Sequence, residues 1–358
     1  MSQHYAAMTA KDITHSAHTI DLRSDTVSLP TDEMLARMTS AKLGDDVYDA
    51  DPTVLELQRI AAELFGKESA LFFPTGTQSN LAAVLSHCQR GEEIIVGREY
   101  HIYCDEAQGV SALGGIGMCP IDTDELGGLS LEKVAKEIKV DDFHYAISRL
   151  VCLENTVSGM VQPQQKIDEI SNLAHDAGLK VHLDGARIFN AHIHTGIPVK
   201  ELVATSDSVS VCLSKGLGTP VGSLLLGEGS FINKAKRNRK LLGGGMRQIG
   251  VLAACGLYAL EYHIERLAKD HKNASILAQG LKQIPQLTVE YSDNQTNMLF
   301  FSCPQQHSAP LQQYLFEHGI TIPTPSDSTR LVCHLGISTE NITTVIDKVG
   351  KYFDRARS

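Results

Sequence analysis

Two stretches, KVHLDGARIF (residues 180–189) and SVSVCLSKGLGTPVGS (residues 208–223), decide the fold of this 358-residue chain. Each begins as a short apolar run, predicted to be a buried strand, and each then changes to small and charged residues. ALFFPTGTQSN (residues 70–80) has the same form, with an apolar run that leads through a turn into a predicted helix. Because open parallel sheets bind ligands beyond the carboxyl ends of their strands, these three strand ends are the candidate functional edge.

Short apolar runs alternate with amphipathic stretches around these segments. Further strands are predicted at residues 92–97 and 149–155, and helices at residues 78–88 and 168–178. This alternation indicates an α/β fold built from repeated βα units, with a mostly parallel sheet, right-handed crossovers and helices on both faces.

Two helices are predicted ahead of the sheet. Thr31 is the expected N-cap of the first, because its hydroxyl precedes a run with helical periodicity. The residues expected on one face of that helix are Met34, Leu35 and Met38. The second helix is predicted over residues 55–66, after a loop at residues 44–53 that Asp51-Pro52 punctuates.

The chain is predicted to divide into three parts. Residues 1–20 are polar and unpatterned, which indicates an N-terminal arm. Residues 21–255 hold the βα units and form the large domain. From residue 256 the chain becomes helical and then mixes strands with helices, so residues 256–358 are expected to form a smaller C-terminal α/β domain.

Composition and charge exclude several classes of protein. Hydrophobic residues make up 42% and charged residues 21%, as in soluble globular enzymes, and 32 basic against 42 acidic residues give a net charge of −10. This balance argues against nucleic acid and anionic membrane surfaces as partners. The sequence has no apolar run of membrane-spanning length and no apolar signal-peptide core near its start, so a cytoplasmic location is expected.

The cysteines and histidines do not form a recognisable metal motif. The eight cysteines include no CxxC pair, and most lie in apolar stretches where a free thiol behaves as a small hydrophobic group. HExxH is absent from the sequence, and no metal site is assigned.

The turn at residues 74–77 is the first candidate binding feature. Gly76 and Thr77 lead directly into a helix N-terminus, whose free amides and dipole favour an anion such as phosphate. The alternative is an ordinary strand-to-helix turn, which also favours glycine and threonine. The turn lacks the glycine spacing of a dinucleotide-binding or P-loop motif.

Asp184 is the second candidate, because it ends an apolar strand and is followed by Gly185, Ala186 and Arg187. His182 shares a strand face with Asp184, since strand side chains alternate with a period of two. A carboxylate at a sheet end could hold a cationic heterocycle through a charge-assisted hydrogen bond. The alternative is that Asp184 only caps the following helix.

Lys215 is the third candidate. It follows a nearly continuous apolar run and precedes Gly216 and Gly218. A lysine buried there would lose solvation, which favours the neutral, nucleophilic amine. A Schiff-base lysine, an aspartate for a pyridinium nitrogen and a helix N-terminus for a phosphate together describe a pyridoxal phosphate site.

The sequence resembles the low-specificity L-threonine aldolases, members of the β-eliminating lyase group. The resemblance runs from Asp21 to the C-terminus and rests on the stretches DLRSDTV, GDDVYDADPTV, FFPTGTQSN, LENT, HLDGARIFNA, CLSKGLGTPVGSLL and LLGGGMRQIGVLAA. It implies the fold of the pyridoxal-phosphate-dependent transferases (fold type I), cleavage of L-threonine or L-allo-threonine to glycine and acetaldehyde, and a homotetramer built from dimers with shared active sites.

The resemblance also implies roles for individual residues. Lys215 would carry the cofactor and Asp184 would pair with its pyridine nitrogen, while His101 would stack on its ring and His144 would lie near the substrate hydroxyl. The remaining matches are Gly76, Thr77 and, from the adjacent subunit, Arg247 for the phosphate, and Ser24, Arg187 and Arg330 for the substrate carboxylate, with Arg187 also counted among the cofactor-binding residues.

Two points stay open in the sequence. The base that takes the β-hydroxyl proton could be His101, His144 or a water near Glu106. Val157 stands where some members of the family carry a histidine, so a role for that histidine cannot operate in this chain.

Other activities remain as alternatives. The same scaffold supports β-elimination from an amino acid and transamination, which differ from aldol cleavage in their products. A protein that binds pyridoxal phosphate without turnover is disfavoured, because the acid–base residue His101 and the arginines are retained. A nicotinamide-dependent dehydrogenase is disfavoured because the glycine fingerprint is absent.

Overall fold

The computed structural model describes residues 20–355 and forms two compact units. The larger unit is the continuous segment Pro30–Ile264. The smaller unit combines the chain up to Leu29 with the chain from Glu265 onward.

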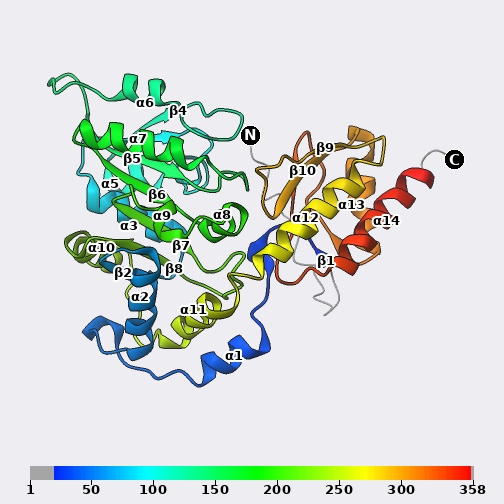
Figure 1. The fold of residues 1–358 in the computed structure, drawn as a ribbon, viewed down its shortest axis with the longest axis horizontal. Helices are drawn as coiled ribbons and strands as arrows, with labels where there is room; N and C mark the ends of the chain where they lie inside the picture. The colour runs from blue at the N-terminus through cyan, green and yellow to red at the C-terminus, as the bar shows by residue number, and fades with distance from the viewer. Residues whose placement is uncertain (1–19, 356–358) are drawn as a thin grey trace. The chain divides into compact units, whose positions relative to one another are not determined.

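A seven-stranded sheet is the centre of the larger unit (Figure 1). Its strands follow the order β2-β8-β7-β6-β5-β3-β4. Their bounds are β2 Ser69–Phe73, β3 Glu92–Gly97, β4 Gly117–Ile121, β5 Ile147–Glu154, β6 Lys180–Asp184, β7 Ser208–Cys212 and β8 Ser223–Gly227. Within this sheet β8 alone runs antiparallel to both of its neighbours, β2 and β7. The carboxyl ends of the other six strands therefore meet at one edge.

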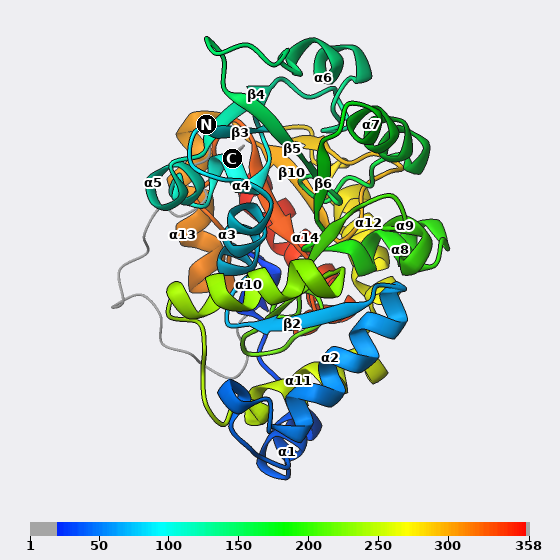
Figure 2. The ribbon, with the colours of Figure 1, turned by 90° about the vertical axis from the view of Figure 1, so that its left-hand side faces the viewer.

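Helices cover both faces of this sheet, as the two ribbon views show (Figures 1 and 2). α3 and α10 pack on β2 and β8, and α2 also contacts β2 and β8, while α7 contacts β5 and β6. The helix bounds are α1 Asp32–Thr39, α2 Pro52–Phe65, α3 Gly76–His87, α4 His101–Cys104, α5 Gly109–Gly114, α6 Leu131–Glu137, α7 Gln164–Asp176, α8 Ile188–Thr195, α9 Val199–Leu202, α10 Gly229–Leu241 and α11 Gly250–Tyr262. Among residues 20–355, no helix combines the length and apolar character needed to cross a bilayer.

The smaller unit contains two short sheets and three α-helices. β1 (Ile20–Asp21) pairs in parallel with β11 (Ile320–Thr321), and β10 lies between β12 and β9 in an antiparallel sheet. The other bounds are β9 Thr288–Glu290, β10 Met298–Ser302, β12 Thr329–Val332, α12 Leu267–Leu281, α13 Ser308–Glu317 and α14 Thr339–Arg355. One apolar cluster joins all three helices to residues from both ends of the chain, Leu22 and Phe353 among them.

The structure confirms the mostly parallel sheet and the one helix N-cap that the sequence predicts for the first helix. Thr31 caps α1 by accepting a hydrogen bond from the amide of Met34. α2 begins earlier than predicted, at Pro52, because Asp51 accepts the amides of Thr53 and Val54 and so caps the helix there.

The α1 face is less buried than its sequence pattern predicts. Met34 is buried, but Leu35 is 41% exposed. α1 packs against α11, and Arg37 of α1 lines a groove in the surface beside the two helices.

The division into two units differs from the predicted domain boundaries. The predicted boundary at residues 255/256 falls inside α11, and the division lies instead between Ile264 and Glu265, after that helix has ended. Residues 21–29, assigned to the large domain from sequence, group with the smaller unit because β1 pairs with β11 and the amide of Val332 donates to Leu22 O. Residues 1–19 of the predicted N-terminal arm lie outside the described residues.

A buried ion pair fixes the loop that follows α1. Arg239 of α10 donates to Asp46 Oδ2 at 2.7 Å and to the carbonyl oxygen of Phe72 at 2.6 Å. Both residues of the pair are less than 5% exposed. Burial raises the pKa of the Asp46 carboxyl, and the Arg239 charge opposes that rise. The amide of Asp46 in turn donates to Arg247 O at 3.1 Å, so this pair also supports the segment that carries Arg247.

Arg239→Leu is expected to lower the free energy of unfolding by about 3–5 kcal/mol, because it leaves the Asp46 carboxyl buried without its cation. Urea unfolding followed by circular dichroism measures the change. Arg237→Leu, an exposed position on the same helix, is the matched control and is expected to change stability by no more than about 0.5 kcal/mol. Equal effects in the two variants would contradict a stabilising role for the pair.

Candidate active site

Four polar residues and one glycine, some predicted and one newly found, gather at the carboxyl edge of the large sheet. Asp184 ends β6, Glu154 ends β5, and Lys215 follows β7 by three residues. Gly76 begins α3 directly beyond β2, and His101 begins α4 beyond β3. The parallel register of these strands therefore brings together segments that are far apart in the sequence.

The Asp184 carboxylate is 3% exposed and fully engaged. Its Oδ2 accepts a 2.8 Å hydrogen bond from Asn80 Nδ2, and its Oδ1 accepts the amide of Ala186 at 2.9 Å. Asn80 lies one turn inside α3 and is 2% exposed. The predicted common face of His182 and Asp184 is confirmed, because His182 Nε2 lies 3.2 Å from Asn80 Oδ1.

His101 and Glu106 form a second pair that shares the same asparagine. His101 Nδ1 lies 2.8 Å from Glu106 Oε1, and Asn80 Nδ2 donates to that same oxygen at 2.8 Å. The carboxylate can only accept while it is ionised, so Nδ1 of a neutral His101 carries the proton and Nε2 is left basic. The His101 side chain is 35% exposed, against 3% for Glu106.

Burial and charge shift the pKa values of this pair. Burial raises the pKa of Glu106, while its hydrogen bonds from His101 and Asn80 act in the opposite direction. Burial lowers the pKa of His101, but the hydrogen bond to Glu106 and the Asp184 charge outweigh it, so the His101 pKa lies above its usual value. The amide of His101 also donates to Glu154 Oε2 at 2.8 Å, and burial raises the pKa of that carboxyl as well.

Lys215 and the α3 N-terminus supply the positive side of this edge. Lys215 is partly exposed, in the turn after β7. At the start of α3 the amides of Gln78 and Ser79 bond to Thr75, which caps the helix. Those of Gly76 and Thr77 are left for an external acceptor, as is usual in the first turn of a helix.

These features fit a phosphorylated pyridine cofactor. A Cβ built on Gly76 would meet no heavy atom within 4 Å, so the helix N-terminus is open to an anion. The ordered carboxylate of Asp184 suits a protonated ring nitrogen, and the Lys215 amine suits a carbonyl carbon. The residues that would hold the cofactor are Gly76, Thr77, His101, Asp184 and Lys215.

The two arginines of the larger unit that the sequence analysis predicts as binding residues, Arg187 and Arg247, occupy different settings. Arg187 is the N-cap residue of α8, three residues after Asp184, and is half-buried at the same edge. Arg247 lies between α10 and α11 with its side chain 55% exposed, and it pairs with Asp45 Oδ2 at 2.9 Å. Arg247 therefore faces solvent, where a second subunit could meet it.

His144 is not brought to the other candidates. It lies three residues before β5 begins, at the amino edge of the sheet, whereas the candidate site is at the carboxyl edge. Its side chain is 66% exposed and bonds to Asp142 Oδ1 at 2.7 Å. The structure therefore does not bring His144 to the other candidates within one chain, and its predicted place near the substrate hydroxyl stays a prediction.

Ser24 and Arg330 belong to the smaller unit. Ser24 caps a short 3₁₀ helix by accepting the amide of Thr26. Arg330 is a half-buried residue of β12 that pairs with Phe300 across the sheet, while its neighbour Leu331 points into the apolar core. The segment that contains Ser24 is attached to this strand through the hydrogen bond from Val332 to Leu22.

Sequence reasoning missed two members of the site, Asn80 and Glu154. Asn80 lies one helical turn after the turn at residues 74–77, and Glu154 ends a predicted strand. Neither an isolated amide nor an isolated carboxylate belongs to a motif whose residue spacing marks it as functional. The structure also brings His101, Glu106 and Asp184 within 4.8 Å of one another, a spacing that could hold a metal ion. Hydrogen bonds among these residues and Asn80 already account for that arrangement.

Glu106→Gln is expected to lower the pKa of His101, because it removes the main hydrogen bond that favours the imidazolium and leaves burial, which opposes it. Histidine NMR titration of the cofactor-free protein, with the His101 signal assigned by its loss in His101→Asn, measures the shift. Asp142→Asn, at the opposite edge, is the control that leaves this titration unchanged. An unaltered His101 titration in Glu106→Gln would show that the pair is not coupled.

Comparison with known proteins gives the family. The sequence model of the beta-eliminating lyases matches residues 21–304. The low-specificity L-threonine aldolase of Escherichia coli K12 is 49% identical over 326 residues, which cover 91% of this chain and 97% of that protein. The low-specificity L-threonine aldolase of Saccharomyces cerevisiae is 34% identical, with 94% of this chain and 87% of that protein covered.

The structural comparison agrees with this assignment. The threonine aldolase of Leishmania major matches with a TM-score of 0.79 at 20% sequence identity, covering 93% of this chain and 99% of that chain. Serine palmitoyltransferase from Sphingomonas wittichii matches with a TM-score of 0.73 at 19% identity, covering 93% of this chain and 86% of that chain, and so has a similar fold. The chain belongs to the beta-eliminating lyase family and is an enzyme of its low-specificity L-threonine aldolase group.

Proposed function

We propose that this enzyme cleaves L-threonine and L-allo-threonine to glycine and acetaldehyde with pyridoxal phosphate as its cofactor. The observation that carries the proposal is the shared carboxyl edge of β2, β3, β6 and β7, where a lysine, a buried aspartate, a histidine and an open helix N-terminus converge. The relatives named for this activity support the choice of substrate.

Bound there, pyridoxal phosphate would supply an attachment point for the amino group and a conjugated ring that accepts the electrons of the broken bond. Lys215 would hold the cofactor covalently through its amine. Asp184, fixed by Asn80 and the Ala186 amide, would hold a proton at the pyridine nitrogen. Gly76 and Thr77 would hold the phosphate with their amides.

His101 would take the proton from the β-hydroxyl group of the substrate. Its Nδ1 is engaged by Glu106, which leaves Nε2 as the basic atom, and the ring is partly exposed. The alternative base is a water near Glu106, whose buried Oε2 has no hydrogen-bond partner within residues 20–355. Arg187, Ser24 and Arg330 would bind the substrate carboxylate and so set the orientation of the bond to be broken.

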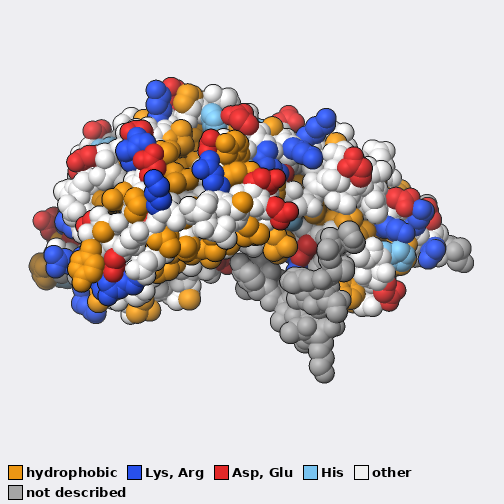
Figure 3. Space-filling model, turned by 90° about the horizontal axis from the view of Figure 1, so that it is seen from below, with side chains coloured by type: hydrophobic (Ala, Val, Ile, Leu, Met, Phe, Trp, Pro, Cys, Tyr) orange, Lys and Arg blue, Asp and Glu red, His pale blue; other side chains and the backbone are white. Residues whose placement is uncertain are grey.

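We also propose a homotetramer, a dimer of dimers with shared active sites, in the cytoplasm. An apolar groove of about 620 Å³ lies between α1, α2 and α11, and Leu64, which lines it, is partly exposed. Hydrophobic side chains gather in a band on that face (Figure 3). Arg247 and His144 are both exposed, and in this assembly each would face the site of a neighbouring subunit.

The first test is product identity in the wild type and in Lys215→Ala. The purified enzyme with pyridoxal phosphate is expected to release acetaldehyde and glycine from threonine, whereas ammonia and a keto acid would indicate elimination. Lys215→Ala is expected to lose at least about a thousandfold in rate, together with the borohydride-reducible link to the cofactor. Lys234→Ala, an exposed lysine, is the control. A reducible adduct that persists in Lys215→Ala would identify a different lysine.

The second test concerns Arg330. Arg330→Leu is expected to bind pyridoxal phosphate normally and to lose about 10- to 100-fold in kcat/KM for threonine, because a carboxylate clamp both binds and orients the substrate. Steady-state kinetics and cofactor titration measure the two effects. Arg355→Leu, exposed at the end of α14, is the control in the same unit. Normal threonine kinetics in Arg330→Leu would remove it from the substrate site.

A further inference from the structure

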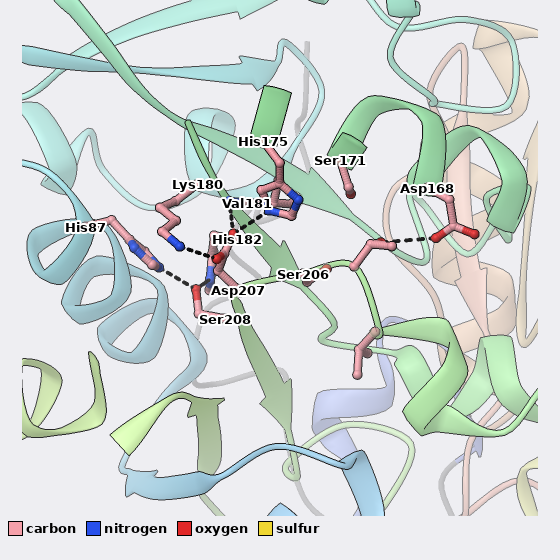
Figure 4. A network of polar contacts seen from close by, with 12 residues as sticks. His87, Asp168, Ser171, His175, Lys180, Val181, His182, Ser206, Asp207 and Ser208 are labelled. Atoms are coloured by element: carbon pink, nitrogen blue, oxygen red, sulfur yellow. Dashed lines mark hydrogen bonds and ion pairs between the residues drawn. The ribbon is translucent and has the colours of Figure 1, made fainter. Parts of the chain in front are cut away.

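A chain of buried polar contacts continues from the active-site asparagine into the interior of the sheet. Asn80 Oδ1 lies 3.2 Å from His182 Nε2, and His182 Nδ1 lies 2.8 Å from Ser208 Oγ on the adjacent strand β7. Ser208 Oγ is also 2.8 Å from His87 Nε2 of α3. Figure 4 shows the two imidazoles on either side of the Ser208 hydroxyl. His182 and Ser208 are both 0% exposed, so the contact between them is buried away from bulk solvent.

His182 and His87, the two histidines in this series of contacts, are both neutral. Burial lowers the pKa of His182 to about 4 and that of His87 to about 3. A neutral imidazole has one donor nitrogen and one acceptor nitrogen, so the contacts of one nitrogen determine what the other can do. The hydroxyl of Ser208 has a single proton to donate, and it can accept a hydrogen bond from His87 Nε2 at the same time.

Asn80 determines which group donates and which accepts in each of these hydrogen bonds. Its amide nitrogen supplies both of its N–H groups, one to Asp184 Oδ2 and one to Glu106 Oε1. Its oxygen must then face His182, which requires the proton on His182 Nε2 and leaves Nδ1 to accept from Ser208. With the opposite tautomer, His182 would attract the amide nitrogen, and the amide oxygen would turn toward two carboxylates. That arrangement is unfavourable in a buried site.

We propose that His182, held by Ser208, is a positioning residue of the active site, because it fixes the Asn80 amide with both N–H groups directed at the carboxylates of Asp184 and Glu106. This inference deepens the proposed function and its kinetic part rests on it. The Asn80 amide therefore serves two carboxylates. It donates to Asp184, proposed to bind the cofactor nitrogen, and to Glu106, which orients His101. A change in His182 would therefore disturb both.

The charged groups around Asn80 explain why the orientation of its amide affects the active site. Asp184, Glu106 and Glu154 are three carboxyl groups at one sheet edge, and Lys215 and His101 are the cations that act on them. Glu106 Oε2 has no partner among the described residues, so the Asn80 and His101 hydrogen bonds to Oε1 are what stabilise this buried group. Loss of the amide orientation would leave both of the carboxylates that it serves short of a donor.

The first measurement needs no cofactor and no substrate. In the cofactor-free full-length protein, two-bond ¹H–¹⁵N spectra of labelled histidine, assigned by the signal lost in His182→Gln, are expected to show His182 as the neutral Nε2–H tautomer at pH 7. Ser208→Ala is expected to mix the two tautomers, because the donor to Nδ1 is gone. Ser171→Ala is the matched control, since Ser171 is also 0% exposed but bonds to Ile167 O in α7.

The second measurement uses the holoenzyme and two substitutions at one site. His182→Phe keeps an aromatic ring but cannot donate, and kcat for threonine is expected to fall about 10- to 100-fold, the equivalent of one lost hydrogen bond to a charged group. His182→Gln places an amide N–H near the position of Nε2 and is expected to recover most of that loss. The KM for threonine is expected to change by less than about threefold in both variants, because His182 does not contact the substrate.

Two results would overturn the proposal. One is a wild-type His182 that is charged or carries its proton on Nδ1. The other is an equal loss of kcat in the Phe and Gln variants, which would indicate a packing role. If the protein lacked threonine cleavage altogether, the tautomer spectra would still decide the orientation of Asn80, so failure of the proposed function and failure of this inference are distinguishable.

Discussion

The burial of one carboxylate, that of Asp184, is the constraint on which the arrangement of the large unit depends. A carboxyl group that is 3% exposed is costly unless each oxygen has a donor. The donors are the Asn80 amide, from a helix that follows the distant strand β2, and the backbone amide of Ala186. The strand order, the position at which α3 starts and the turn after β6 must therefore together place these donors within hydrogen-bond distance of the Asp184 carboxylate.

The two edges of the sheet have different properties as a consequence. At the carboxyl edge, helix N-termini and strand ends converge, and burial shifts the pKa values of His101, Glu106 and Glu154. At the amino edge, the polar groups pair with one another: Asp207 accepts hydrogen bonds from Lys180 at 2.7 Å and from His175 at 2.8 Å, as Figure 4 shows. These partly exposed pairs satisfy the Asp207 carboxylate within the chain.

Local patterns predicted the parts of this structure that depend on nearby residues. The strands at Asp184 and before Lys215, the Thr31 cap and the turn that leads into α3 each follow from a few adjacent residues, and the structure has them. The motif match that predicts a role for His144 does not say on which edge of a sheet its loop lies, and the structure has this loop at the amino edge. Asn80 was missed because its importance comes from partners at positions 106, 182 and 184, and such long-range contacts leave no spacing in the sequence.

The pairing of β1 with β11 has a consequence for the order in which the chain can fold. The larger unit is one continuous segment, so it can complete its core while synthesis of the rest continues. The smaller unit needs Ile20 and Leu22 in the same core as Ile320 and Phe353. The N-terminal residues of this unit can therefore form their native contacts only after nearly the whole polypeptide has left the ribosome. We therefore expect chains truncated before α14 to retain a folded larger unit and to expose the apolar residues of the unfinished smaller one to aggregation and proteolysis.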